Sequence, residues 1–127
     1  MFREKFIARV PEKIVEAANF PLRSWQRTFN AACWVRFQHA LPHEVSLVLH
    51  FTDDEGKKAA AIDRCRCDKS NNILLSGHFT LAGKGKVKEM GLYLAVSDSE
   101  VSYVIDELYI QSCEAGAAPQ AKIIHAA

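Results

Sequence analysis

The stretch "GLYLAVSDSEVSYVIDELYIQ", residues 91–111, decides the fold. It holds two runs in which apolar and other side chains alternate, separated by the polar segment "SDSE". Successive side chains of a β-strand point to opposite faces, so alternation of this kind indicates a strand with one buried face. The stretch therefore predicts two β-strands joined by a tight polar turn, with Tyr93, Tyr103 and Tyr109 inside them.

The same pattern recurs along the chain from Thr28 onward, with turn-forming residues every 10 to 15 positions. Strands are predicted over 29–38, 44–52, 58–67, 72–81, 87–96 and 101–111. "REKFIARV" (3–10) adds another strand, and "PEKIVEAAN" (11–19) is either a short helix or a strand. The expected fold class is all-β, a jelly-roll β-sandwich of about eight antiparallel strands. We expect one domain over 1–114 and a flexible tail over 115–127.

Each predicted strand has an apolar face, which should fill the layer between two sheets. These residues are Cys33, Val35, Phe37, Leu47, Leu49, Phe51, Leu75, Phe79, Leu81, Met90, Leu92, Leu94 and Val96. The opposite face mixes aromatic, hydrogen-bonding and small side chains. Its residues are Ala32, Trp34, Arg36, Gln38, Ser46, Val48, His50, Ser76, His78, Thr80, Gly91, Tyr93 and Ala95.

Composition excludes several classes of function. The chain has 127 residues, 49% of them hydrophobic, and a formal charge of +1. A nucleic-acid partner would call for a basic face, and a membrane partner for an apolar run of roughly 20 residues, so neither is expected. The first residues lack the apolar stretch of a signal peptide, which favours the cytoplasm unless the chain is a domain excised from a secreted protein.

No catalytic constellation stands out. Asp106 and Glu107 are neighbours in one predicted strand, hence on opposite faces, and cannot flank a glycosidic bond. His50 and His78 would meet only if their strands are neighbours on the second face. Cysteines at 33, 65, 67 and 113 lack the paired C-x₂-C spacing of zinc sites and are expected to be free thiols. We expect no enzyme, unless the chain is a module of a larger carbohydrate-active enzyme.

The second face has the chemistry that sugars require. The C–H faces of sugars stack on aromatic rings, as cations do, and their hydroxyls need directional polar partners. Trp34 and Tyr93 are the predicted stacking platforms. The predicted polar partners are Arg36, Gln38, His50 and His78. Trp25 is predicted to form one wall of the site. The alternative for Trp34 is a ring covered by the N-terminal segment or a loop.

Two segments carry a family resemblance. "FNAACWVRFQ" (29–38) resembles the "Y-x-x-S-x-W-V-K" strand of jelly-roll carbohydrate-binding modules of the xylan- and β-glucan-binding type, in the galactose-binding-like superfamily. Residues 71–111 are similar to the C-terminal half of those modules, with "W-x-x-L-x-G-x-F-T-L", "V-x-L-Y-V-E" and "F-Y-V-D-D-V-S-V" strands, although Asn72 and Ile73 stand near the position of the family's Trp. The resemblance implies that Trp34 and Tyr93 line a cleft, and that Asp106 is structural or helps to hold calcium. Ala95 stands where xylan binders often carry a sugar-contacting Glu.

The expected function is therefore non-catalytic binding of a polysaccharide or another glycan by an aromatic-lined sheet face. No cofactor is expected, and calcium at Asp106 is the only metal candidate. The alternative is a cytoplasmic protein–protein interaction domain of the same galactose-binding-like fold, because a fold does not determine function. Its interface, rich in Trp, Tyr and Arg, would be the second face or an exposed edge strand.

Overall fold

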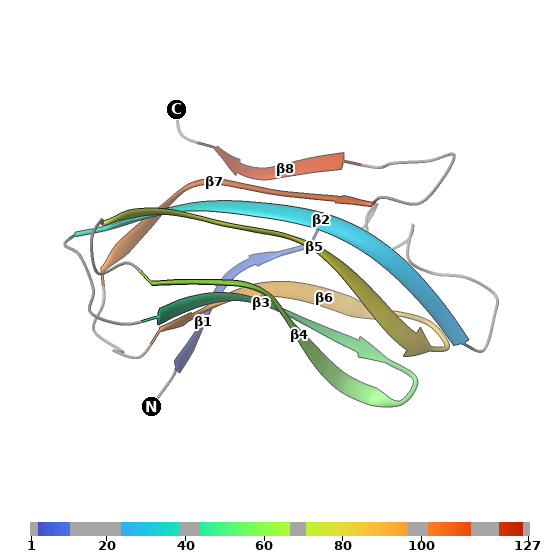
Figure 1. Ribbon diagram of the computed structural model, residues 1–127. Coiled ribbons are helices and arrows are strands. Elements are labelled where there is room, and N and C mark those ends of the chain that lie inside the picture. Colours follow the sequence, from blue (N-terminus) through green and yellow to red (C-terminus); the bar gives the residue numbers. More distant parts are fainter. Residues whose placement is uncertain are drawn as a thin grey trace.

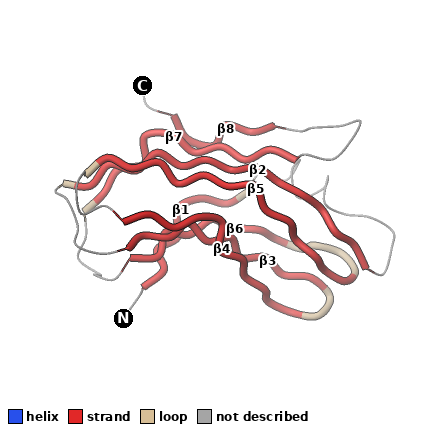
Figure 2. Tube along the Cα trace, in the orientation of Figure 1, coloured by secondary structure: helices blue, strands red, loops and turns tan. Residues whose placement is uncertain are grey.

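The computed structural model describes residues 3–10, 24–38, 44–66, 71–96, 102–112 and 120–125. They form an antiparallel β-sandwich of two sheets packed face to face (Figures 1 and 2). This confirms the predicted all-β class. The segment "PEKIVEAAN" lies outside the described residues, so its helix and strand interpretations stay predictions.

Eight strands are present in the described ranges. They are β1 (Arg3–Arg9), β2 (Ser24–Phe37), β3 (Glu44–Asp53), β4 (Gly56–Arg66), β5 (Asn72–Lys84), β6 (Glu89–Val96), β7 (Tyr103–Ser112) and β8 (Gln120–His125). The strand predicted from "REKFIARV" and the six predicted between 29 and 111 are confirmed, with ends shifted by a few residues. The structure differs from the expected flexible tail in one respect, because residues 120–125 form β8 beside β7.

Sheet A has the strand order β1-β6-β3-β4, and sheet B has the order β5-β2-β7-β8. Strands β6 and β7 belong to different sheets, so these two strands do not form a hairpin. A Greek key sets three consecutive strands side by side, whereas among the described strands only β3–β4 and β7–β8 are consecutive neighbours. The order does not establish a jelly roll, and that connectivity stays a prediction.

The core lies between the sheets, where the predicted apolar faces meet. All thirteen residues predicted for this layer are buried. Phe29, Leu108 and Ile110 join them, and the Phe29 ring stacks on Phe79 with centroids 5.7 Å apart. Cys33 is a free thiol inside this layer, and burial raises its pKa to about 12, so it acts as an apolar side chain.

The two sheets meet along one side, where β4 passes β5. A bulge at Ile62 interrupts the pairing of β4 with β3. A Cβ placed on Gly77 of β5 would lie 2.5 Å from the Ile62 carbonyl oxygen, so only glycine allows this approach. Next to it, the Ser76 N–H donates to a carboxylate oxygen of Asp63 at 2.9 Å. A side chain of sheet A thereby supplies the hydrogen-bond acceptor for one backbone N–H at the edge of sheet B.

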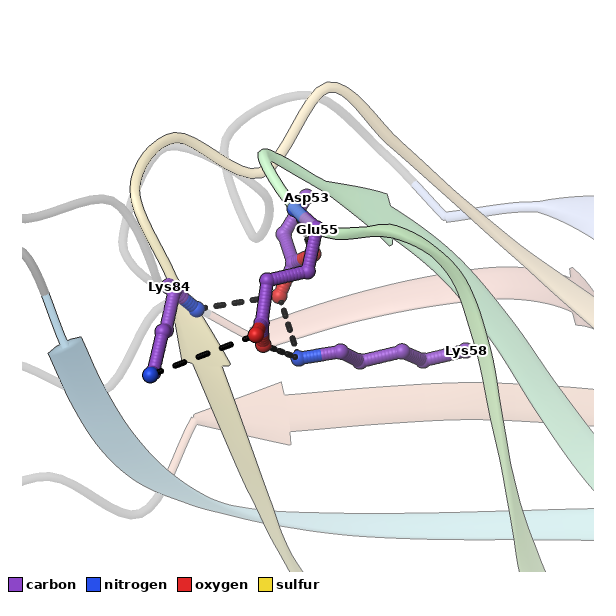
Figure 3. A network of polar contacts seen from close by, with 4 residues as sticks. All are labelled: Asp53, Glu55, Lys58 and Lys84. Atoms are coloured by element: carbon purple, nitrogen blue, oxygen red, sulfur yellow. Dashed lines mark hydrogen bonds and ion pairs between the residues drawn. The ribbon is translucent and has the colours of Figure 1, made fainter.

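A second junction is centred on Asp53, the last residue of β3 (Figure 3). Its buried carboxylate accepts the backbone N–H of Glu55 at 2.8 Å and that of Lys84, at the end of β5, at 3.0 Å. The Lys58 ammonium lies 2.9 Å away. Burial alone would raise the pKa of Asp53, but the bonds from Lys58, Lys84 and Glu55 lower it to about 2. This carboxylate therefore ties the β3–β4 hairpin of sheet A to sheet B.

Candidate binding site on the outer face of sheet A

The predicted ligand-binding residues are divided between two outer surfaces. Tyr93 of β6 and His50 of β3 lie on sheet A. Trp34, Arg36, Gln38 and His78 lie on sheet B, at or just beyond its strands β2 and β5. The prediction that Trp34 and Tyr93 share one surface is therefore wrong. Two-residue alternation says which side chains point outward, but not which of the two sheets carries a strand. The side chain of Trp25 lies outside the described residues.

Three rings gather on the outer face of sheet A. Phe6 of β1 is the register partner of Tyr93, and its side chain is 57% exposed. The two ring centroids are 5.4 Å apart in an edge-to-face arrangement. The His50 ring meets the other side of Tyr93 with centroids 4.5 Å apart. Such contacts fix the rings relative to one another and leave Phe6 open to solvent.

Gly91 forms the floor beside these rings. It pairs with Arg9 on one side and with His50 on the other. A Cβ at this position would lie 3.2 Å from Cε1 of Tyr93 and 3.4 Å from Cε1 of Phe6. Atoms of both rings therefore lie over Gly91, and a larger residue there would push against them. The surface beside the rings has a hollow of about 580 Å³. Its lining is Glu4, Phe6, Arg9, His50, Phe51, Thr52, Lys57, Glu89, Met90, Gly91 and Tyr93.

Charged side chains surround this hollow. The Glu4 carboxylate contacts Nε2 of His50, joining β1 to β3 across β6. Lys57 and Glu89 are both register partners of Thr52. Within the described ranges, Arg9, Lys57 and Glu89 form no ion pair, so their charged groups are available to a ligand.

The outer face of sheet B is different in character. Trp34 is 42% exposed, and its register partners are Leu74 of β5, which is 39% exposed, and Glu107 of β7. Val104, which is 53% exposed, is the register partner of Arg36 in the next row. Arg36 donates to both carboxylate oxygens of Asp106, from Nη2 at 2.8 Å and from Nε at 3.1 Å. The bonds from Arg36 lower the pKa of Asp106 below its ordinary value. This face combines exposed apolar side chains with an ion pair that is already formed.

A β-bulge overturns the expected placement of Asp106 and Glu107 on opposite faces. Val35 pairs with Ile105 and Trp34 pairs with Glu107, which leaves Asp106 as the extra residue. Ile105 packs against the core and Leu108 is buried, so both acidic residues lie on the outer side. The carboxylate of Asp106 forms an ion pair with Arg36. Within the described part of the chain, no three His, Cys, Asp or Glu residues gather closely enough to hold a metal ion.

The histidines and cysteines form no joint site among the residues described. His50 and His78 belong to different sheets and face away from each other, so they do not meet as the sequence allowed. Cys65 is a half-buried free thiol on β4. His39, His43, Cys67 and Cys113 lie outside the described residues.

Sequence reasoning missed Phe6 and Glu4, which complete the cluster around Tyr93. A signal was present, because alternation in "REKFIARV" places both on one face of the strand. Their position beside Tyr93 depends on the pairing of β1 with β6, which joins residues nearly 90 positions apart and leaves no local trace. A bulge at Ile7 further shifts this register.

The fold and this surface together define the chain as an antiparallel two-sheet β-sandwich with a ring-lined hollow on one outer face. No family model, curated protein or solved structure matches the chain. In the ranges that the structure describes, no helix is long and apolar enough to cross a membrane.

Proposed function

We propose that the protein is a non-catalytic binding module that takes a carbohydrate in the hollow of sheet A. The observation that carries the proposal is the exposed ring of Phe6, fixed against Tyr93 above a floor without a side chain at Gly91. A flat sugar ring needs an aromatic face and open space beside it, and this arrangement supplies both.

The polar groups around the rings suit the remaining surface of a sugar. Glu89 accepts hydrogen bonds from hydroxyls, Lys57 donates to them, and the Thr52 hydroxyl does either. Specific ligand sites commonly combine such apolar walls with a few placed polar groups. The predicted residues Tyr93 and His50 keep their role in this proposal, joined by Phe6 and Glu4.

The hollow has two carboxylates, but it is proposed as a binding site and not as a glycosidase. Glycoside hydrolysis uses one carboxyl group as the acid and a second as base or nucleophile. Glu4 is engaged by His50, which leaves Glu89 as the carboxylate available to a ligand.

A second candidate is protein binding through the outer face of sheet B. Trp34 lies between the exposed Leu74 of β5 and the half-buried Glu107 of β7, and the exposed Val104 lies one row away. The Arg36 guanidinium is engaged by Asp106. Figure 1 also shows β2 bowed, with its convex side away from sheet A. Such a surface suits the apolar centre of a protein interface better than a sugar.

The test is a glycan array followed by calorimetry on the glycans that bind. Tyr93→Ala should weaken binding at least tenfold, which corresponds to about 1.4 kcal/mol. Tyr109→Ala is the matched control, since this half-buried tyrosine belongs to β7 of sheet B, and it should stay within about twofold of the parent protein. If Tyr93→Ala does not fold, Phe6→Ala at the exposed edge strand replaces it.

Two results would contradict the proposal. The first is an array on which no glycan binds. The second is a loss of binding by Trp34→Ala with Tyr93→Ala unchanged, which would move the functional surface to sheet B.

A further inference from the structure

We infer that the sugar bound in the hollow is an acidic one, whose carboxylate is held by Arg9. This inference rests on the proposed function and names the class of glycan. It goes beyond stacking, because it assigns a ligand group to the Arg9 guanidinium, a cation of the lining that has no ion-pair partner among the described residues.

The charged groups of the hollow that remain for a ligand favour an anion. The titratable groups that line it are Glu4, Arg9, His50, Lys57 and Glu89, together with the phenol of Tyr93. Glu4 is hydrogen-bonded to Nε2 of His50, so its carboxylate is already engaged. Two cations, Arg9 and Lys57, and one carboxylate, Glu89, then remain for a ligand. Within the described ranges neither Arg9 nor Lys57 has an ion-pair partner, and both are exposed.

The register places the cations where a stacked sugar would present a substituent. Arg9 pairs with Gly91, one row along the sheet from the pair of Phe6 and Tyr93. No side chain at position 91 stands between the Arg9 guanidinium and the floor. Lys57 lies across the hollow on β4, beside Thr52 of β3. A sugar ring resting on Phe6 therefore has a guanidinium on one flank, and guanidinium groups bind carboxylates through two parallel hydrogen bonds.

Glu89 sets the orientation of this ligand. It lies in the row of Thr52 and Lys57, one row beyond Gly91 and two rows from Tyr93. A carboxylate on the sugar is repelled by Glu89 and attracted to Arg9, which lies one row nearer to Tyr93, while sugar hydroxyls donate to Glu89 and accept from Lys57 in the same row. The two rows thus discriminate between the charged and the uncharged side of a uronic acid.

The test uses a panel of uronic-acid oligosaccharides, among them galacturonate, glucuronate and mannuronate oligomers, each paired with its methyl ester. The ester keeps the ring and its C–H faces but removes the charge. Neutral oligosaccharides complete the panel. At least one acid should bind about tenfold more tightly than its ester, and Arg9→Gln should reduce that ratio toward one. Lys86→Gln, an exposed cation outside the hollow, is the control for general attraction and should keep the ratio.

The outcomes separate the two proposals. If esters or neutral oligosaccharides bind as well as the acids, and Tyr93→Ala still abolishes binding, the acidic class is overturned and the sugar site stands. If Lys86→Gln lowers the ratio as much as Arg9→Gln, the attraction is not local to the hollow and the inference fails. If no glycan of any charge binds, both proposals fail together.

Discussion

The two outer faces of this sandwich rest on one core and yet differ in chemistry. On sheet A, the rings lie beside a hollow, and Arg9, Lys57 and Glu89 in its lining have no ion-pair partner in the part of the chain that the structure describes. On sheet B, Trp34 lies in a row with the apolar Leu74 and the acidic Glu107, and Arg36 is bound to Asp106. The comparison teaches that an exposed tryptophan alone does not mark a sugar site. Open space and available polar groups beside the ring are needed as well.

The largest expected effect on stability comes from removing the Asp53 carboxylate, which links sheet A to sheet B. Asp53→Ala leaves the Lys84 and Glu55 N–H groups without their acceptor and should lower the free energy of unfolding by about 3 kcal/mol near neutral pH. Urea titration followed by circular dichroism measures this loss. Lys57→Ala, on the same hairpin but outside the network, is the control.

The same carboxylate predicts a pH dependence. The pKa of Asp53 is lowered from 3.8 to about 2 by folding, so its contribution is complete above pH 4 and disappears as pH falls through 2. The stability difference between the parent protein and Asp53→Ala should shrink by about 2 kcal/mol between pH 5 and pH 2. A difference that stays constant over this range would show that the carboxylate is not held as described.

The next effect concerns the contact between the edges of the two sheets. Gly77→Ala drives a Cβ against the fixed carbonyl oxygen of Ile62 and should cost about 1–3 kcal/mol. Ser76→Ala, with an exposed side chain on the same strand, should have little effect. Trp34 lies in β2, so its fluorescence follows sheet B, whereas circular dichroism follows both sheets. The two transitions should coincide, and separated midpoints would mean that the sheets unfold independently.

The smallest effect is expected on the outer face of sheet B. Arg36→Ala breaks an exposed ion pair, so the unfolding midpoint should change little and glycan affinity in the hollow should not change. The pKa of Asp106 should rise toward its ordinary value, since Arg36 is what lowers it. Carbon-detected NMR of the carboxyl group measures this rise. An unaltered pKa would contradict the bidentate contact.

The sequence predicts the layers of this molecule well, because alternation is local. Every residue expected in the inner layer, from Cys33 to Val96, is buried, and seven strands lie close to their expected positions. The β8 strand was not predicted, since "QAKIIH" follows an alanine-rich segment with the composition of a loose terminus.

The candidate site was predicted only in part. Tyr93 and His50 were identified from their outward positions, and they do lie together. Their separation from Trp34 depends on which strands pair, and pairing joins distant segments without a local signal. Asp106 and Glu107 share one side because of a single extra residue, and a one-residue bulge is equally invisible in an alternating pattern.

The most direct test of the account is a ¹H–¹⁵N NMR titration of the protein with an oligosaccharide that binds on the array. The account predicts that the amide of Gly91, on the floor of the hollow, shifts with the ligand, together with those of Phe6 and Thr52. The amide of Ala32, beside Trp34 on β2, should stay in place. Shifts confined to Ala32 and its neighbours on sheet B, with Gly91 unchanged, would contradict the central claim.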